Sequence, residues 1–502
     1  AERGPTDQPV VVNGIADFQS RFGGLWSKSK LGFAVQDFFR NDGSKAVIVR
    51  VVHKDSDPAK AAARAKFSMP VGAVALILET KSPGSWGNNV RIRVSHPADD
   101  KISKETAVRY GVNVTDLFEL LVHDMSTGKT EAWKDLTLVA SSRQVKSVLE
   151  QGSELIHVDG DAPTTGRPDK SNAPKPNEDI WAVATKPDAH GQGSDGNPVT
   201  PVDILGDPAK KTGLYALEGA DIFNLLCIPP FAANDADVPG NVWDDALAYC
   251  RKRRAVLLID PPSTWKSKEQ ATKISDARRD KLLPAPENFA ALFFPRIVQP
   301  NPLRENQLEE FVPCGAVAGI IARTDSTRGV WKAPAGTEAR LRGVTSLSVP
   351  LTDAENGELN SLGVNCLRTL PATGHVVWGA RTLEGDDRLA SQWKYLPVRR
   401  TALFIEESLY RGTQWAAFEP NDEPLWAQLR LNIGAFMHGL FQQGAFQGKS
   451  PNEAYFVNCD GNTTTQADID RGIVNVVIGF APLKPAEFVV LYIQQIAGQL
   501  PT

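Results

Sequence analysis

The sequence predicts a mixed α/β protein, in which helices flank a mixed sheet, together with a smaller β-rich module. Two observations predict the mixed α/β fold. Ala255–Asp260 is a short, nearly all-apolar run, which is typical of strands covered on both faces, and Pro424–Phe441 repeats apolar residues at helical spacing. The β-rich part is predicted by Asn89–Ser95, which alternates with a period of two residues.

The first 80 residues alternate helix and strand signals. Gly14–Phe22 and Leu31–Arg40 space their aromatic residues as helical faces, and Lys45–Val52 is a β-branched run that predicts a buried strand. A third helix is predicted over Asp57–Lys66, because Asp57 can cap it and a proline occupies its first turn.

A change of pattern at Lys81 marks the β-rich module. A turn at Ser82–Ser85 is followed by several short strands: Asn89–Ser95, Leu117–Val122, Glu131–Val139 and Glu154–Val158. The module ends in a long segment rich in proline and glycine, Asp159–Pro201, which we expect to be a flexible, exposed loop.

From Asp203 onward the α/β pattern returns. We expect strands at Asp221–Ile228, Ala290–Val298 and Gly374–Leu383, and a helix at Val242–Arg254 directly before the apolar strand.

The last part of the chain combines one clear helix with strands. Pro424–Phe441 carries a single apolar stripe made of Leu425, Leu429, Ile433, Phe436 and Leu440. Strands are predicted at Ala454–Asn458, Ile473–Gly479 and Ala486–Ile496. The last of these is long and β-branched, and an exposed edge of this kind pairs readily with another chain.

Composition excludes several classes of protein. The 502 residues predict about three domains. With 55 Lys+Arg against 59 Asp+Glu, the net charge of -4 argues against binding to nucleic acid or anionic membranes. The five cysteines are scattered, which indicates reduced thiols in a cytosolic folding environment. There is no apolar run long enough to span a membrane.

The chain carries no recognised catalytic motif. Gly444–Ser450 resembles a phosphate loop but has one residue too few between its glycines and follows a helix, so a helix end explains Gly444 better. The seven histidines show no ligand spacing. We therefore expect no catalytic residues, no cofactor and no metal. The basic run Arg251–Arg254 is explained by its place at the end of a helix, with an electrostatic protein interface as the alternative.

Several longer motifs then follow one another in order: Gly315–Gly319, Ala322–Asp325, Arg328–Gly336, Val377–Leu383, Arg399–Arg400, Phe404–Ser408, Tyr410–Gly412, Phe418–Asn421, Thr463–Thr465 and Phe480–Phe488. Together they resemble the sheath protein of contractile phage tails and of related contractile injection systems. The resemblance covers roughly residues 203–502, and Ser85–Asn89 resembles the entry into the family's inserted domain.

The resemblance implies a two-part subunit. Residues 1–80 and 203–502 would form a sheath core that is discontinuous in sequence, and residues 81–202 an inserted β-rich outer domain. Subunits would stack as hexameric rings in a helix around an inner tube protein, with baseplate and terminal cap proteins as further partners, and would be assembled in the bacterial cytoplasm. Contraction would need no enzyme activity.

Two sets of interaction residues follow from the resemblance. Terminal arms of the family add strands to neighbouring subunits, which assigns an inter-subunit link to Tyr492, Ile493, Gln494, Gln495 and Ile496. The family's segment before Arg3-Gly4-Pro5 is missing, which we interpret as an absent linker arm. Candidates for the face toward the tube are Arg399, Arg400, Glu406, Glu407, Arg411, Glu419, Glu423 and Arg430. The alternatives are another structural tail component, such as a tube or capsid-like subunit, and an α/β enzyme of unknown substrate.

Overall fold

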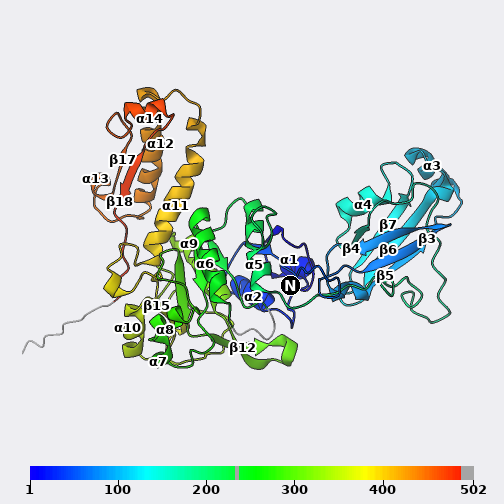
Figure 1. Cartoon of the computed structure of the whole chain (residues 1–502), viewed down its shortest axis with the longest axis horizontal. Helices are drawn as coiled ribbons and strands as arrows, with labels where there is room; N and C mark the ends of the chain where they lie inside the picture. The colour runs from blue at the N-terminus through cyan, green and yellow to red at the C-terminus, as the bar shows by residue number, and fades with distance from the viewer. Residues whose placement is uncertain (232–236, 488–502) are drawn as a thin grey trace, which may run out of the picture. The chain divides into compact units, whose positions relative to one another are not determined.

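The computed structural model describes residues 1–231 and 237–487 (Figure 1). The chain divides into two units. The first comprises chiefly Ala1–Val35 and Lys45–Asp221, and the second comprises Gln36–Ser44, Ile222–Pro229 and the described residues from 237 onward. Helix α2 (Leu31–Arg40) belongs in part to each.

The first unit begins with a small antiparallel pair of strands, β1 (Pro9–Val12) and β2 (Ala46–Val49). The unit also contains the helices α1 (Ile15–Phe22) and α5 (Pro201–Leu205) and the 3₁₀ helix η3 (Gly213–Gly219). The buried guanidinium of Arg50 donates hydrogen bonds to the carbonyls of Ala1, Glu2, Gly4 and Pro83. This side chain therefore holds the first residues of the chain against the turn at Pro83.

Two three-stranded antiparallel sheets form the β-rich part of this unit. The first has the order β3-β4-β8, with β3 (Lys66–Val71), β4 (Val74–Thr80) and β8 (Ile156–Val158); the second has the order β5-β6-β7, with β5 (Val90–Ser95), β6 (Leu117–Asp124) and β7 (Thr130–Thr137). The alternation along β5 confirms the period-two prediction, since Val90, Ile92 and Val94 are buried in one core with Phe67, Leu78 and Phe118. The other elements of this part are η1 (Ser85–Asn89), α3 (Lys101–Tyr110), η2 (Val114–Asp116) and α4 (Val145–Gly152).

The helix predicted over Asp57–Lys66 is wrong. This stretch is a series of turns, and its backbone groups are used elsewhere: Ala63 exchanges two hydrogen bonds with Ser194, and the N–H of Lys66 donates to the carbonyl of Gly191. A helix would need these groups for its own i to i−4 bonds. Pairing with the segment 159–201 therefore prevails over the local capping signal.

The segment 159–201 has no helix or strand before Pro201, as predicted, but it is bonded along its length. The backbones of Thr185 and Ile92 exchange hydrogen bonds of 2.8 and 3.1 Å, and Ser171 donates to the carbonyl of Val94. The carboxylate of Asp195 accepts from Ser85 and pairs with Lys28. The segment thus follows β5 as an ordered part of the unit.

The second unit contains a five-stranded mixed sheet with the order β16-β15-β11-β10-β9. Strands β9 (Leu225–Cys227), β10 (Val256–Ile259), β11 (Ala290–Phe294) and β15 (Val364–Leu370) are parallel, and β16 (Gly374–Val377) is antiparallel. Every residue of β10 and β11 is buried. Helices α6 (Gly240–Arg253), α9 (Cys314–Arg328) and α10 (Asp353–Ser361) pack on these strands (Figure 1), which confirms the mixed α/β prediction.

Three of the predicted strands of this region are shorter than expected. Asp221–Ile228 is a strand only over Leu225–Cys227. Ala290–Val298 is divided at Pro295, which cannot donate a ladder hydrogen bond, and its second half continues as β12 (Ile297–Asn301) in a separate sheet with β13 (Gln307–Phe311) and β14 (Ser346–Leu347). Gly374–Leu383 is a strand only as far as Val377. The short helices here are α7 (Lys268–Ala271), α8 (Ile274–Arg279), η4 (Pro302–Arg304) and η5 (Asp387–Leu389).

The C-terminal part of this unit has its own hydrophobic core between α11 (Leu396–Gly412), α12 (Glu423–Gln442) and the antiparallel pair β17 (Tyr455–Asn458) and β18 (Val477–Phe480) (Figure 1). The predicted stripe of α12 is confirmed at Leu425, Leu429, Ile433 and Leu440, all of which are buried. The remaining elements are η6 (Gln414–Ala416), α13 (Pro451–Ala454) and α14 (Gln466–Asp470). The strand predicted over Ala486–Ile496 falls almost wholly outside the described residues.

Three other features are absent from the described ranges. No helix in these ranges is long and apolar enough to cross a bilayer. No group of three or more His, Cys, Asp or Glu side chains in them could hold a metal ion. All five cysteines are described, and none of them forms a disulfide.

Asp260 is a buried carboxyl group at the end of β10. Its Oδ1 accepts a hydrogen bond of 2.9 Å from the backbone N–H of Cys314, at the start of α9, and its Oδ2 has no partner among the described residues. Burial raises the pKa of Asp260 to about 7, although the N–H of Cys314 and the charge of Arg296 oppose this shift.

We expect Asp260→Asn to stabilise the protein at pH 8 but not at pH 4. Because the folded pKa is raised, the wild-type protein loses stability as the pH rises from the unfolded value near 4 to about 7, on the order of a few kcal/mol in total. The neutral amide avoids this loss. Melting temperatures of both proteins across this range should diverge with rising pH, whereas the exposed-site control Asp245→Asn should follow the wild type; parallel curves for Asp260→Asn would contradict the expectation.

Candidate interaction site

The structure separates the predicted charged candidates into buried and exposed residues. Arg399 is 8% exposed, and its guanidinium lies over the rings of Phe289 and Trp393 at 4.1 and 4.6 Å. Arg400 is 5% exposed and donates two hydrogen bonds, of 2.8 and 2.5 Å, to the carboxylate of Asp325. Both charges are used inside the chain to fix the start of α11. Their burial removes these two arginines from the exposed candidates.

Glu407 and Arg430 also have partners within the chain. Glu407 is partly buried and accepts hydrogen bonds from Arg254 at 2.9 Å and Arg411 at 2.7 Å, and these two cations lower its pKa although burial by itself would raise it. Arg430 pairs with Glu423 at 2.5 Å and donates to the carbonyl of Cys459. The pair with Arg254 joins α11 to the end of α6, and the hydrogen bond to Cys459 joins α12 to the segment after β17, whereas the Glu407–Arg411 and Glu423–Arg430 pairs lie within α11 and α12.

The candidates that remain at the surface are Glu406, Arg411, Glu419 and Glu423. Beside Glu419, the side chain of Phe418 is fully exposed, and its backbone has a φ of 70°. This left-handed conformation is unfavourable for a bulky residue. The loop before α12 therefore projects an aromatic ring and a carboxylate together into solvent.

A buried ion pair of the second unit joins Arg381 to Glu487. Arg381 follows β16, and its side chain is 1% exposed. Its Nε and one terminal nitrogen donate to the two carboxylate oxygens of Glu487 at 2.7 and 2.6 Å, so that the pair is bidentate. The other terminal nitrogen donates to the carbonyl of Gly385 and to Asp387 at 2.9 and 3.1 Å. We call this ion pair of Arg381 and Glu487 the clamp.

Three elements of the fold position the clamp. Asn365 in β15 accepts a hydrogen bond from the backbone N–H of Arg381 at 2.6 Å and donates to its carbonyl at 2.8 Å. Gly379 makes this contact possible, because a Cβ at that position would lie 2.9 Å from the backbone of Asn365. Asn360 in α10 and the hydroxyl of Tyr395 donate to Glu487 at 3.0 and 3.3 Å. The sheet, a helix and a loop thus converge on the last described residue.

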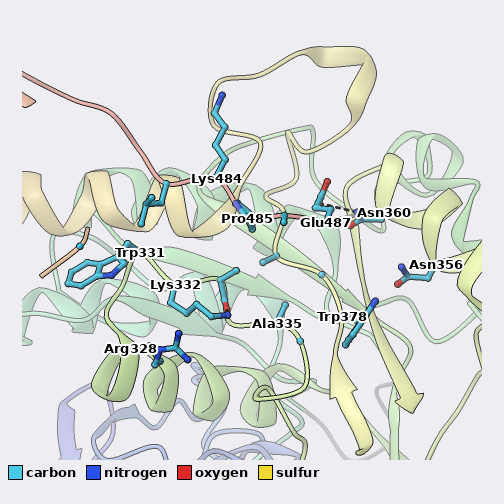
Figure 2. Close-up of a pocket in the computed structure, with 17 residues that line it drawn as sticks. Arg328, Trp331, Lys332, Ala335, Asn356, Asn360, Trp378, Lys484, Pro485 and Glu487 are labelled. Carbon is cyan, nitrogen blue, oxygen red and sulfur yellow. Dashed lines mark hydrogen bonds between the residues drawn. The ribbon is translucent and has the colours of Figure 1, made fainter. Parts of the chain in front are cut away.

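A groove of about 590 Å³ adjoins the clamp (Figure 2). Trp331 and Trp378 lie on opposite sides of it, with Lys332 and Ala335 between them. The segment Leu483–Glu487 forms another part of its lining, and α10 contributes Asn356 and Asn360. Gly336 belongs to the loop that carries Lys332, and its N–H donates to the carbonyl of Val377 at 2.9 Å, which attaches the loop to β16.

Three sequence motifs that are far apart in the chain meet at this groove. Arg328–Gly336 and Val377–Leu383 supply the tryptophans and Arg381, and Phe480–Phe488 supplies Glu487. The sequence signalled all three motifs, but it did not show that they share one site. The predicted linking residues, from Tyr492 to Ile496, lie outside the described residues.

We expect Glu487→Gln to destabilise the second unit by about 2–4 kcal/mol at pH 7, because it leaves the buried Arg381 charge without its main partner. Burial by itself would raise the pKa of Glu487, but the hydrogen bonds from Arg381 and Asn360 lower it. The clamp is therefore intact above the usual pKa of Glu and is lost as the pH falls below about 4.

Thermal melts of the wild type and Glu487→Gln should accordingly converge below pH 4. Glu338→Gln is the matched control, since it removes one carboxylate from an exposed ion pair with Arg328, and it should change stability little. A Glu487→Gln variant that melts with the wild type at pH 7 would show that the clamp contributes nothing.

Two family models match neighbouring parts of the chain. A family model for the central domain of phage tail sheath proteins matches residues 199–383, and a model for the phage tail sheath C-terminal domain matches residues 390–496. The clamp joins the two matched regions, since Arg381 belongs to the first and Glu487 to the second.

Individual relatives extend the comparison. The tail sheath protein of Vibrio phage KVP40 is 27% identical over 188 residues, which is 37% of this chain but only 27% of that protein, so the match covers about a quarter of this relative. A sheath tail protein from Listeria innocua shares the fold, with a TM-score of 0.59 over 96% of this chain and 93% of that one, at 13% identity.

The sheath of the extracellular contractile injection system called PVC, solved in its contracted state, is 31% identical; the match covers 56% of this chain and 73% of that chain, with a TM-score of 0.48. The two sheath models together match more than half of the chain, which shows that the chain belongs to the family of phage tail sheath proteins.

Proposed function

We propose that this chain is the subunit of a contractile sheath that surrounds the inner tube of a phage tail or of a phage-tail-like injection system. Subunits polymerise as stacked hexameric rings between a baseplate and a terminal cap, and contraction of the sheath drives the tube through a target envelope. The observation that carries the proposal is the clamp, which fixes the chain at Glu487, near the start of the strand predicted over Ala486–Ile496 and ahead of the predicted linking residues.

The clamp suits a link that has to bear load. A bidentate pair between a planar guanidinium and a carboxylate resists displacement in more than one direction. Its Arg381 side is attached to the central sheet through Asn365. Tension on the segment after Glu487 is thereby transmitted to the sheet of the same subunit.

The pair β17–β18 is our candidate for the sheet that receives the arm of a neighbouring subunit. It has only two strands, and over Val477–Phe480 the described residues pair β18 with β17 alone. Unpaired strand edges accept an added strand through main-chain hydrogen bonds. Phe456 and Val477 are exposed on this pair, and an added strand would cover part of their apolar surface.

Contraction requires no cofactor in this proposal. It is a switch between two packings of the same subunits, driven by differences in interface area and charge complementarity. A gain of about 1 kcal/mol per subunit becomes hundreds of kcal/mol when it is summed over hundreds of copies. In this proposal residues 1–80 and 203–502 serve as the core of the subunit and residues 81–202 as its outer domain, although β3 and β4, at the end of the first segment, share a sheet and a hydrophobic core with strands of the outer domain.

The face toward the tube includes Glu406, Arg411, Glu419 and Glu423. These are the exposed members of the charged candidate set, and Phe418 adds an exposed aromatic ring beside Glu419. Charged rims of this kind set the rate of association and its salt dependence more than the final affinity.

Deleting Gln494–Thr502 should abolish assembly while the rest of the chain stays folded. The wild-type chain should form rings or tubes in negative-stain electron micrographs, and the truncated chain should remain monomeric with an unchanged melting temperature. Replacing the nine residues by a glycine-serine linker of equal length is the control for length and should also prevent assembly. Tubes formed by the truncated chain would refute the linking role, and a wild-type chain that stays monomeric under assembly conditions would refute the proposed function.

The double variant Glu406→Lys, Glu419→Lys should weaken binding to the inner tube several-fold at low ionic strength, and salt should reduce the difference from the wild type. Co-sedimentation of sheath with preformed tubes would measure this. Polymerisation of the sheath alone should persist in the variant, and Glu338→Lys, at an exposed site on another segment, should bind tubes normally. Equal tube binding by the double variant would exclude this face.

A further inference from the structure

The groove beside the clamp contains two buried polar atoms that the described chain does not satisfy. Asn356 and Asn360 are 9% and 6% exposed, and the side-chain oxygen of each accepts no hydrogen bond from the described residues. The orientation of Asn360 is fixed, because its amide nitrogen donates to Glu487 at 3.0 Å. Buried acceptors without donors cost free energy, so the pair favours a ligand that supplies N–H or O–H groups.

The spacing of the two oxygens favours an extended polypeptide. Asn356 and Asn360 are four residues apart on α10, which separates them by about 6 Å along the helix axis. In an extended strand, alternate residues direct their N–H groups to the same side at a spacing of about 6.6 Å. A strand that runs along α10 therefore carries donors at the same spacing as the two asparagines.

The other residues that line the groove, cations and tryptophans, indicate which side chains the bound strand should have. Two cations that line the groove, Lys332 and Lys484, form no ion pair among the described residues, whereas Arg328 is paired with Glu338 and the charge of the one carboxylate in the lining, Glu487, is balanced by Arg381. The groove therefore attracts carboxylates. Trp331 and Trp378 flank it on opposite sides (Figure 2) and offer apolar surface to a residue between them.

We propose that this groove binds an extended, acidic segment of a second copy of this chain. The inference rests on the proposed function, because a sheath places copies of the chain next to one another. Charge favours the same occupant: the chain carries more carboxylates than cations, 59 against 55, whereas the groove has the opposite balance. The contact is separate from the strand pair β17–β18 and would be a second link between subunits.

Photo-crosslinking identifies the occupant directly. Full-length subunits with benzoylphenylalanine in place of Ala335 are prepared with natural isotopes, mixed with ¹⁵N-labelled subunits, assembled and irradiated. We expect crosslinked peptides that pair a light and a heavy chain and that contain an acidic segment. Crosslinks only within one chain, crosslinks only to another protein, or none at all in assembled particles would overturn the proposal. The same photoreactive residue at Lys449, which is exposed and outside the lining, controls for random contacts.

Asn356→Leu separates binding from structure. The substitution removes an unpaired buried acceptor, so the melting temperature of the unassembled subunit should stay equal or rise, whereas the concentration needed for assembly should increase at least about fivefold. Lys332→Glu should also impair assembly, and Lys449→Glu should not.

Normal assembly of both groove variants would contradict the groove inference alone, because wild-type tubes would still support the proposed function. A drop in the melting temperature of Asn356→Leu would assign Asn356 a structural role and contradict the inference as well. If the wild-type chain forms no tubes, the proposed function fails and the groove inference fails with it.

Discussion

The charge of Arg381 is almost entirely removed from water, and this constraint organises the second unit. A buried guanidinium is tolerated only if acceptors inside the protein surround it. Here they come from Glu487, Asp387 and the carbonyl of Gly385. Because Asn365 in the central sheet fixes the backbone at the same place, one side chain ties the sheet to a segment more than a hundred positions later in the chain.

Much of the charge on this chain has a structural role of this kind. Arg399 lies between two aromatic rings, Arg400 is paired with Asp325, and Arg50 binds four backbone carbonyls. Asp260 has the opposite environment, with one oxygen unpaired. The surface available to partners is therefore smaller than the number of charged residues suggests, and a run of charges in the sequence need not be a binding face.

The sequence was sufficient where burial is simple and local. Apolar content identified β10, and a helical stripe identified α12, because these elements bury one continuous surface. Prediction from the sequence failed where contacts between distant segments determine the secondary structure. The helix predicted over Asp57–Lys66 is displaced by hydrogen bonds to residues beyond 190.

Prediction of the candidate site from the sequence had the same limit. The motifs that contain Arg381 and Glu487 were recognised, but their pairing spans 106 positions, and no local pattern indicates which carboxylate a buried arginine will meet. The acceptors in α10 were missed altogether, because an asparagine that is buried without a partner looks like any other helical asparagine in sequence. The burial of Arg399 and Arg400 was equally invisible, since both stand in a run that alternates charged and apolar residues.

The pair β17–β18 has a consequence for how an assembly of this chain would fail. A sheet of two strands has two edges, so one subunit could hold two neighbours while it is itself held by others. If each subunit is linked to more than two others in this way, the subunits form a branched network with closed loops. When one connection in such a network breaks, the load passes around the gap, whereas a simple chain of subunits would part at its first broken link.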